Sequence, residues 1–183
     1  MRKEGNLATF LDAVYPHIGD SWAGLPEELF LFVSTLTPLV NVDLLIQDDA
    51  GRTLLTWRDD AFYGPGWHVP GGVIRFQETA AERLRAVARL ELGVDVESDP
   101  APVAVHELID AGRRERGHSI ALLYRCRLLA PLSEASRASS SPPRPDQWAW
   151  HERCPQNLIA EHRVYQRFFH EKGRSGDRNL RPR

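Results

Sequence analysis

The residues best suited to chemistry lie within residues 64–94, where glycines and charged side chains follow one another closely. Gly71 and Gly72 let the backbone approach a ligand closely. A helix is expected from about Thr79 to Gly93, with Glu91 near its end. A glycine loop before a helix N-terminus suits phosphate, and carboxylates suit a divalent cation. The stretch therefore predicts a site for phosphate and a metal ion together.

Four titratable side chains are candidates for a general base. Asp43 shares one face of an expected strand with Asn41, which indicates either a pocket-lining face or a half-exposed strand. His68 enters the glycine loop, while Glu107 and His118 lie on later strands. A histidine with its ordinary pKa of about 6.5 can accept a proton at neutral pH, although both histidines are equally compatible with burial beneath the sheet.

Composition restricts the class of protein. The 183 residues are 42% hydrophobic and 26% charged with a net charge of −2, which is typical of a soluble globular domain without a nucleic-acid or membrane partner. Cys126 and Cys154 have no partners at zinc-binding spacing, so two reduced thiols are expected. No apolar run resembles a signal peptide or a membrane span, and a cytoplasmic location is expected.

Hydrophobic periodicity predicts an α+β, or α/β, arrangement. Helices are expected at 6–17 and 26–36, with Pro16 beyond the end of the first, and at 79–93 and 155–170. Strands are expected at 39–47 and 52–58, joined by a hairpin, and at 103–110, 118–128 and 147–151, while 59–66 and 94–102 are expected to be loop and linker. This order predicts a sandwich with a mixed sheet between helices.

Three segments are expected along the chain. Residues 1–35 form an N-terminal helical extension that covers a sheet edge or makes a dimer contact, 36–171 form the main domain, and 172–183 form a disordered basic tail. Residues 132–145 are of low complexity and are expected to be mobile. The arginine-rich turn at 111–117 is interpreted as solvated, with phosphate binding as the alternative.

The spacing of the central stretch resembles the Nudix box, G-x5-E-x7-R-E-U-x-E-E-x-G-U, where U is a bulky aliphatic residue. The matching positions are Gly72, Glu78, Glu91, Gly93 and Val94, preceded by the usual lead-in of Trp67 and 70–72. The resemblance covers about residues 36–171 and implies an α/β/α sandwich. Ala86, Val87 and Leu90 replace the box arginine and two glutamates, so Glu91 is the helix carboxylate that remains.

A similar reduced box occurs in GDP-mannose mannosyl hydrolases, whose lead-in is a Thr-Pro-Leu-Val strand with an aspartate, followed by an arginine. This chain has that tetrapeptide at 37–40, then Asp43 and Arg58. The resemblance implies Mg²⁺, or Mn²⁺, held by the Gly71 carbonyl and Glu91, with Arg58 on the substrate diphosphate. It also offers Arg75 and Trp67 as substrate contacts, and Glu78 as a residue that fixes the loop or binds metal.

The activity that the resemblance implies is Mg²⁺-dependent hydrolysis of a nucleotide-sugar, in which water attacks the anomeric carbon and a nucleoside diphosphate leaves. The Gln-His pair that supplies the base in that branch is absent, and only Asp146 or Gln147 stands at the corresponding place. Cleavage of a P–O bond and a non-catalytic nucleotide-binding domain are the alternatives. Nudix proteins are often dimers, so a homodimer is compatible with the resemblance.

Overall fold

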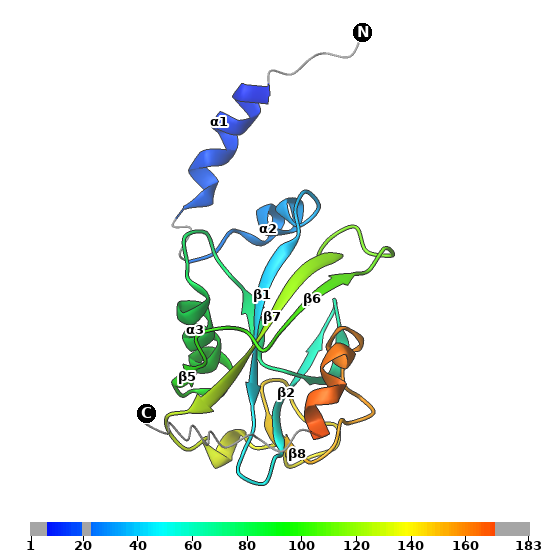
Figure 1. The fold of residues 1–183 in the computed structure, drawn as a ribbon. Helices are drawn as coiled ribbons and strands as arrows, with labels where there is room; N and C mark the ends of the chain where they lie inside the picture. The colour runs from blue at the N-terminus through cyan, green and yellow to red at the C-terminus, as the bar shows by residue number, and fades with distance from the viewer. Residues whose placement is uncertain (1–6, 20–22, 171–183) are drawn as a thin grey trace, which may run out of the picture.

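The computed structural model describes residues 7–19 and 23–170, so the tail at 172–183 lies outside the described residues. The elements are α1 (Leu7–Ile18), α2 (Glu27–Val33), β1 (Leu39–Ile46), β2 (Thr53–Asp60), β3 (Gly64–His68), β4 (Gly71–Val73), α3 (Ala80–Leu92), β5 (Val96–Ser98), β6 (Ala104–Ile109), β7 (His118–Leu128), the 3₁₀ turn η1 (Glu134–Ser136), β8 (Trp148–His151) and the 3₁₀ helix η2 (Ala160–His170). Figure 1 shows their arrangement.

The strands form two sheets. The larger has the order β4-β1-β7-β5, with β6 also paired to β7, and it is mixed because β1 and β7 run parallel while the other pairs are antiparallel. The smaller sheet, β3-β2-β8, is antiparallel. The predicted α+β sandwich with a mixed sheet is therefore confirmed, and the antiparallel sheet adds to it.

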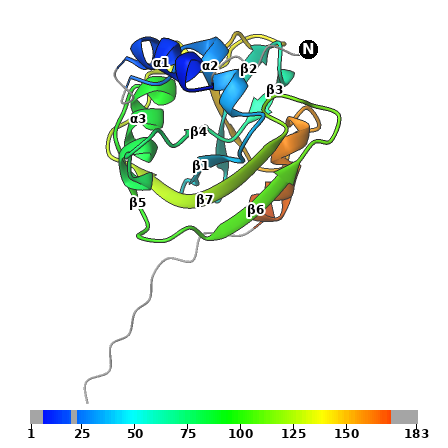
Figure 2. The same ribbon diagram turned by 90° about the horizontal axis from the view of Figure 1, so that it is seen from above.

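The larger sheet is buried on both faces. Its inner side chains Val42, Leu44 and Ile46 pack with Leu84 and Val87 of α3 in one apolar cluster. A second cluster lies on the opposite face and contains Leu45, Leu55, Trp57, Trp67, Val69, Ala121, Leu123, Leu158, Tyr165, Phe168 and Phe169. Figure 2 shows the large sheet between α3 on one side and η2, in orange, on the other.

Local chemistry fixes both ends of α3. The Thr79 hydroxyl accepts the N–H of Glu82, and the Glu82 carboxylate accepts the N–H of Thr79, which is a reciprocal capping box. Gly93 ends the helix at φ +70, a left-handed conformation that glycine adopts at little cost. The expected boundaries of this helix are confirmed, and they fix the position of Glu91 in its last turn.

Several expected elements in the first half of the chain differ from those observed. Pro16 lies inside α1 rather than beyond its end, and it supplies no backbone N–H for a helical hydrogen bond there. The second helix ends at Val33, and the hydroxyl of Ser34 bonds back to the carbonyl of Leu31. The predicted turn at 48–51 forms, but β1 and β2 separate after a single bridge between Gln47 and Thr53 and enter different sheets.

Other differences concern segments that were expected to be irregular, and the type and start of the helix expected at 155–170. Most of 59–66 forms the β2–β3 hairpin, whose turn is closed by Asp60 accepting the N–H groups of Phe62 and Tyr63. The linker at 94–102 contains β5, because Val96 is buried and pairs with β7. The closing helix is of 3₁₀ type and begins at residue 160. Within 132–145, Arg137 forms a bridge to Trp148.

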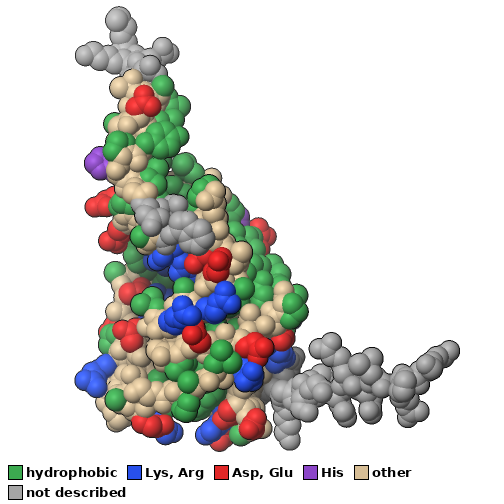
Figure 3. Space-filling view, turned by 90° about the vertical axis from the view of Figure 1, so that its left-hand side faces the viewer, with side chains coloured by type: hydrophobic (Ala, Val, Ile, Leu, Met, Phe, Trp, Pro, Cys, Tyr) green, Lys and Arg blue, Asp and Glu red, His purple; other side chains and the backbone are tan. Residues whose placement is uncertain are grey.

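The two N-terminal helices differ in their contact with the rest of the chain. Figure 1 shows α1 standing away from the sheets and α2 lying beside the start of β1. None of the residues of α1 is buried, and Leu7, Phe10 and Tyr15 are exposed. Figure 3 shows hydrophobic side chains gathered along this helix. Within residues 7–19 and 23–170, every helix is too short or too polar to cross a membrane.

Candidate active site

A cavity of about 730 Å³ opens where the two sheets, the β6–β7 turn and the start of η2 meet. Its size is within the usual range of small-molecule sites. Its polar and charged lining residues include Asn41, Asp43, Arg58, Tyr63, His68, Glu107, Arg113, Arg116, Glu161 and His162. Asn41 and Asp43 therefore face a cavity, which is one of the two arrangements that their strand pattern allowed.

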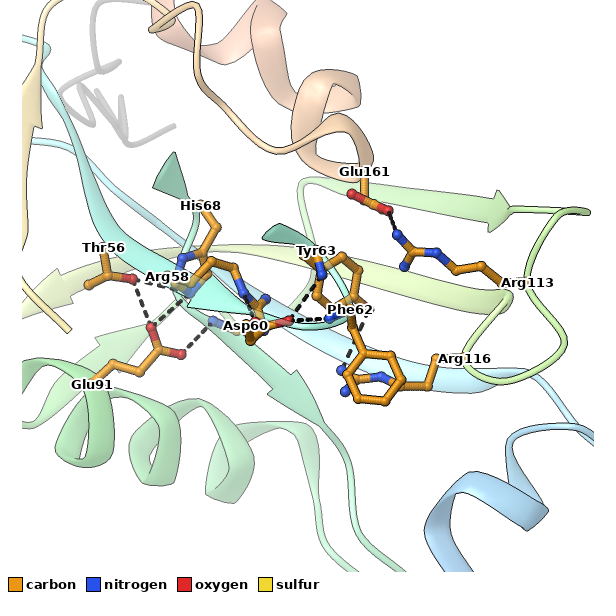
Figure 4. Close-up of polar contacts among 11 residues, drawn as sticks. Thr56, Arg58, Asp60, Phe62, Tyr63, His68, Glu91, Arg113, Arg116 and Glu161 are labelled. Carbon is orange, nitrogen blue, oxygen red and sulfur yellow. Dashed lines mark hydrogen bonds and ion pairs between the residues drawn. The ribbon is translucent and has the colours of Figure 1, made fainter. Parts of the chain in front are cut away.

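Glu91 reaches from the last turn of α3 toward Thr56 and His68 (Figure 4). Its Oε1 accepts the N–H of Gly71 at 3.1 Å, and its Oε2 accepts the hydroxyl of Thr56 at 2.8 Å. The same Oε2 lies 3.2 Å from Nε2 of His68, and only 15% of the Glu91 side chain is exposed. Glu91 thus sits directly behind Gly71 and His68, which line the cavity.

Asp43 lies on the other side of Gly71, its partner in the β1–β4 register. A Cβ at position 71 would collide with Oδ1 of Asp43, so only glycine permits this approach. Oδ2 accepts the hydroxyl of Tyr165 at 2.5 Å. Burial raises the pKa of Asp43 to about 7, with a smaller contribution from the charge of Glu91, while Tyr165 and His68 oppose the shift. Two carboxylates therefore flank Gly71.

His162 of η2 was not identified from the sequence. Its Nδ1 accepts the N–H of Val69 at 2.9 Å, so the neutral ring carries its proton on Nε2. Burial, together with the charges of His68 and Arg58, holds the pKa of His162 well below its ordinary value. A neutral Nε2–H donor therefore lines the cavity. No local motif pointed to it, because it reaches the site only when η2 folds back onto β3.

The structure separates the other predicted site residues into two groups. Arg58 lines the cavity, donates to Asp60 at 2.5 Å and lies over the ring of Tyr63. Glu107 also lines the cavity, although 62% of its side chain is exposed and it pairs with His118 at 3.2 Å. His118 is not among the lining residues.

Three predicted positions have their main contacts elsewhere. Trp67 packs edge-on against Trp57 in the second apolar cluster and is not among the lining residues. The Arg75 guanidinium lies beside Gly24, in the segment that leads to α2. Glu78 accepts from Arg83 Nε at 2.7 Å and from the Arg75 N–H at 2.9 Å. Its contacts thus hold the loop that precedes α3.

We expect the substitution Glu78→Gln to lower the free energy of unfolding by about 3 kcal/mol, because it leaves the buried Arg83 charge uncompensated. The Glu78 and Arg83 side chains are only 7% and 8% exposed. Glu97→Gln is the matched control, because Glu97 of β5 forms an exposed ion pair with Arg127 of β7. We expect this substitution to lower the free energy of unfolding by less than about 1 kcal/mol. Urea unfolding measures both variants, and equal losses would contradict a structural role for Glu78.

Comparison with known proteins identifies the fold. No family model matches the chain. The crystal structure of a MutT Nudix hydrolase from Burkholderia pseudomallei superposes on 72% of this chain and 97% of its own, with a TM-score of 0.55 and 25% identity. This match agrees with the resemblance of residues 64–94 to the Nudix box. The chain has the fold of the Nudix hydrolases.

Two further proteins differ in what they share with this chain. A MutT protein from Methanosarcina mazei Go1 shares the fold, with a TM-score of 0.54 and 18% identity over 73% of this chain and 91% of its own. The low-salt glycan biosynthesis protein Agl8 of Haloferax volcanii is 39% identical over 72 residues. That match spans 39% of this chain and 46% of Agl8, which is about half of that relative's length.

Nudix hydrolases generally use divalent cations, and the residues around Gly71 are consistent with one such ion. Among the described residues, no cluster of three or more His, Cys, Asp or Glu side chains is arranged to hold a metal. The available donors are the carboxylates of Asp43 and Glu91 and the backbone of Gly71. Mg²⁺ typically binds through one or two carboxylates together with water and substrate phosphates. A nearby cation would also favour the ionised form of Asp43, whose pKa is raised mainly by burial.

Proposed function

We propose that this Nudix protein is a Mg²⁺-dependent hydrolase of a nucleoside diphosphate sugar resembling GDP-mannose. The observation that carries the proposal is the pair of carboxylates, Asp43 and Glu91, on either side of Gly71 at a cavity that also contains Arg58. The partial match to a protein named for glycan biosynthesis supports the choice of a sugar derivative.

The proposed reaction breaks the bond between the anomeric carbon and the diphosphate oxygen. Asp43 removes a proton from water, the water oxygen bonds to the anomeric carbon, and the nucleoside diphosphate leaves with the electron pair of the broken bond. A pKa of about 7 suits Asp43 for this role at neutral pH, and Tyr165 holds the carboxylate in place. The products are the free sugar and the nucleoside diphosphate.

The remaining residues have binding roles in this scheme. Glu91 and the carbonyl of Gly71 would hold Mg²⁺, and the bound cation would neutralise the charge that develops on the departing diphosphate. Arg58 contacts the diphosphate, and the Nε2–H of His162 donates to a polar atom of the substrate.

Unpartnered polar atoms around the cavity support a polar ligand. Within the described part of the chain, Oδ1 of Asn41, Nδ1 of His68 and Nε of Arg116 are buried without a hydrogen-bond partner, and all three residues line the cavity. Buried polar atoms normally have partners, so their clustering at one cavity indicates that a ligand or ordered water completes them.

Hydrolysis of GDP-mannose, UDP-glucose and ADP-ribose in ¹⁸O-labelled water with Mg²⁺ tests the proposed reaction. We expect turnover of a nucleotide-sugar with the label in the released sugar, because water attacks carbon. Label in the phosphate product would instead establish P–O cleavage. Nucleotide binding without any turnover would contradict the enzyme assignment and favour a binding domain.

A further inference from the structure

The β6–β7 turn contributes two arginines to the cavity. Arg113 and Arg116 are among its lining residues, whereas Arg114 is exposed and borders a separate hollow beside α2. The interpretation of this turn as solvated therefore describes Arg114, while the other two arginines face the site described above. The turn brings positive charge to the side of the cavity opposite β4.

Three guanidinium groups lie around the ring of Tyr63 at this side of the cavity. The ring centroid of Tyr63 lies 4.4 Å from Cζ of Arg58, 5.0 Å from that of Arg113 and 5.1 Å from that of Arg116. Arg116 also lies over the ring of Phe62 at 4.6 Å. Figure 4 shows these side chains converging beside the β2–β3 hairpin. Contact with aromatic faces orients a guanidinium without neutralising its charge.

The three arginines differ in how their charge is balanced. Arg58 pairs with Asp60 at 2.5 Å, and Arg113 pairs with Asp110 at 3.0 Å and with Glu161 at 3.2 Å. Arg116 forms no ion pair within the described residues. A terminal nitrogen of its guanidinium lies 3.5 Å from the Tyr63 hydroxyl.

Arg116 also carries a polar atom that the protein leaves unsatisfied. Its Nε is buried and has no partner among the described residues. A buried donor without a partner is costly, and the cost is greater when the group is charged. An anion in the cavity would remove that cost.

The N-terminal extension holds Arg116 in an uncommon backbone conformation. Arg116 has φ +56, a region that non-glycine residues seldom occupy. Its N–H donates to Oγ of the buried Ser34, directly after α2, at 3.0 Å. Phe30 of α2 lies beneath the same guanidinium, with its ring centroid 5.7 Å from Cζ. Contacts from α2 thus reach both the backbone and the side chain of Arg116.

We propose that Arg116 binds an anionic oxygen of the substrate diphosphate, and that α2 positions it through Ser34 and Phe30. This proposal rests on the proposed function in naming the ligand as a diphosphate. Arg58 and Arg116 flank the same tyrosine ring, so they can contact the same diphosphate from two sides. In this arrangement the N-terminal extension completes the binding site.

Substitution of Arg116 by glutamine tests the proposal, with Arg114→Gln as a matched control that removes the same charge from the same turn. Calorimetric titration with GDP and with inorganic pyrophosphate gives a readout independent of turnover. We expect R116Q to weaken GDP binding about tenfold or more, since it loses a charge-assisted hydrogen bond, and R114Q to change it less than about twofold. KM should rise more than kcat falls.

Ser34→Ala and Thr35→Ala test the role of α2. The Ser34 hydroxyl accepts from Arg116, whereas the neighbouring Thr35 hydroxyl is exposed and donates to the carbonyl of Phe32. We expect S34A to weaken GDP binding in the same direction as R116Q but by less, and T35A to leave it unchanged. Equal affinities for S34A and T35A would overturn the positioning role.

The outcomes separate this proposal from the proposed function. Equal GDP affinities for R116Q and R114Q would overturn the role of Arg116, even if the wild type hydrolyses nucleotide-sugars. A wild type without hydrolytic activity whose GDP binding depends on Arg116 would refute the proposed reaction and support this site. If thermal melts show that R116Q is poorly folded, R116K replaces it. Weakened binding then supports the proposal, and unchanged binding overturns it.

Discussion

Replacement of Asp43 by asparagine is expected to lower kcat at pH 7 by about 100-fold or more, with a much smaller change in KM. Asparagine keeps the shape of the side chain and can still accept the Tyr165 hydroxyl, which Asp43 accepts at 2.5 Å. It cannot remove a proton from water. The loss should therefore appear in the chemical step, and steady-state kinetics with the substrate identified by the ¹⁸O experiment measures it.

The pH profile of the wild type provides an independent check on Asp43. Burial raises the pKa of Asp43 to about 7 in the metal-free protein, and a bound cation lowers it from that value. We therefore expect kcat/KM measured with Mg²⁺ to rise with pH and to level off at or below pH 7. A profile that stayed flat far into the acid range would contradict Asp43 as the base, because its ionised form is then a minor species.

The raised pKa of Asp43 also predicts that this residue lowers the stability of the fold at high pH. Its pKa is about 7 in the fold against an ordinary value of 3.8, so folding favours the neutral acid. This stabilising contribution is fully present below pH 3.8 and is lost as pH rises through about 7. In metal-free buffer at pH 8, D43N should therefore melt at a higher temperature than the wild type. A lower melting temperature would show that the asparagine disturbs the site.

Tyr165→Phe is the control that distinguishes loss of the base from loss of the hydroxyl that orients it. It removes the hydroxyl that orients Asp43 but leaves the carboxylate in place. We expect Y165F to retain more activity than D43N. If D43N kept wild-type kcat and the wild-type pH profile, Asp43 would not be the base, and Glu107, which also lines the cavity, would be the next carboxylate to test.

Replacement of Glu91 by glutamine has the second large expected effect, a loss of about 100-fold in Mg²⁺-dependent turnover. Glutamine can still occupy the place beside Gly71 and Thr56, but it lacks the negative charge that a cation requires. Glu97→Gln is again the control, because it removes the same charge from an exposed ion pair between Glu97 of β5 and Arg127 of β7. Turnover by E91Q that matched the wild type at every Mg²⁺ concentration would contradict a metal-binding role for Glu91.

The parts of the site that depend on local chemistry were predictable from the sequence. Thr79 and Gly93 have side-chain and backbone preferences that fix the ends of α3 wherever the helix packs, so the position of Glu91 followed from them. The alternation of β1 correctly placed Asn41 and Asp43 on one face, although periodicity alone does not say whether such a face is open to solvent or to a cavity.

The parts that depend on long-range packing were not predictable in this way. The contact between Asp43 and Gly71 arises from the pairing of β1 with β4, whose register no local motif reveals. His162 and Arg116 enter the cavity from η2 and from the β6–β7 turn, which are distant from the box in sequence. Trp67 belongs to the core because strand alternation directs it away from its neighbour His68, which faces the cavity.

Binding of Mn²⁺ tests most directly whether Glu91, together with the carbonyl of Gly71, holds a cation. Electron paramagnetic resonance measures free Mn²⁺ during titration of the wild type, E91Q and E97Q, each with saturating GDP and without any need for turnover. We expect one Mn²⁺ per chain in the wild type and E97Q, with binding weakened about tenfold or more in E91Q. Equal Mn²⁺ affinity in all three proteins would contradict this role of Glu91.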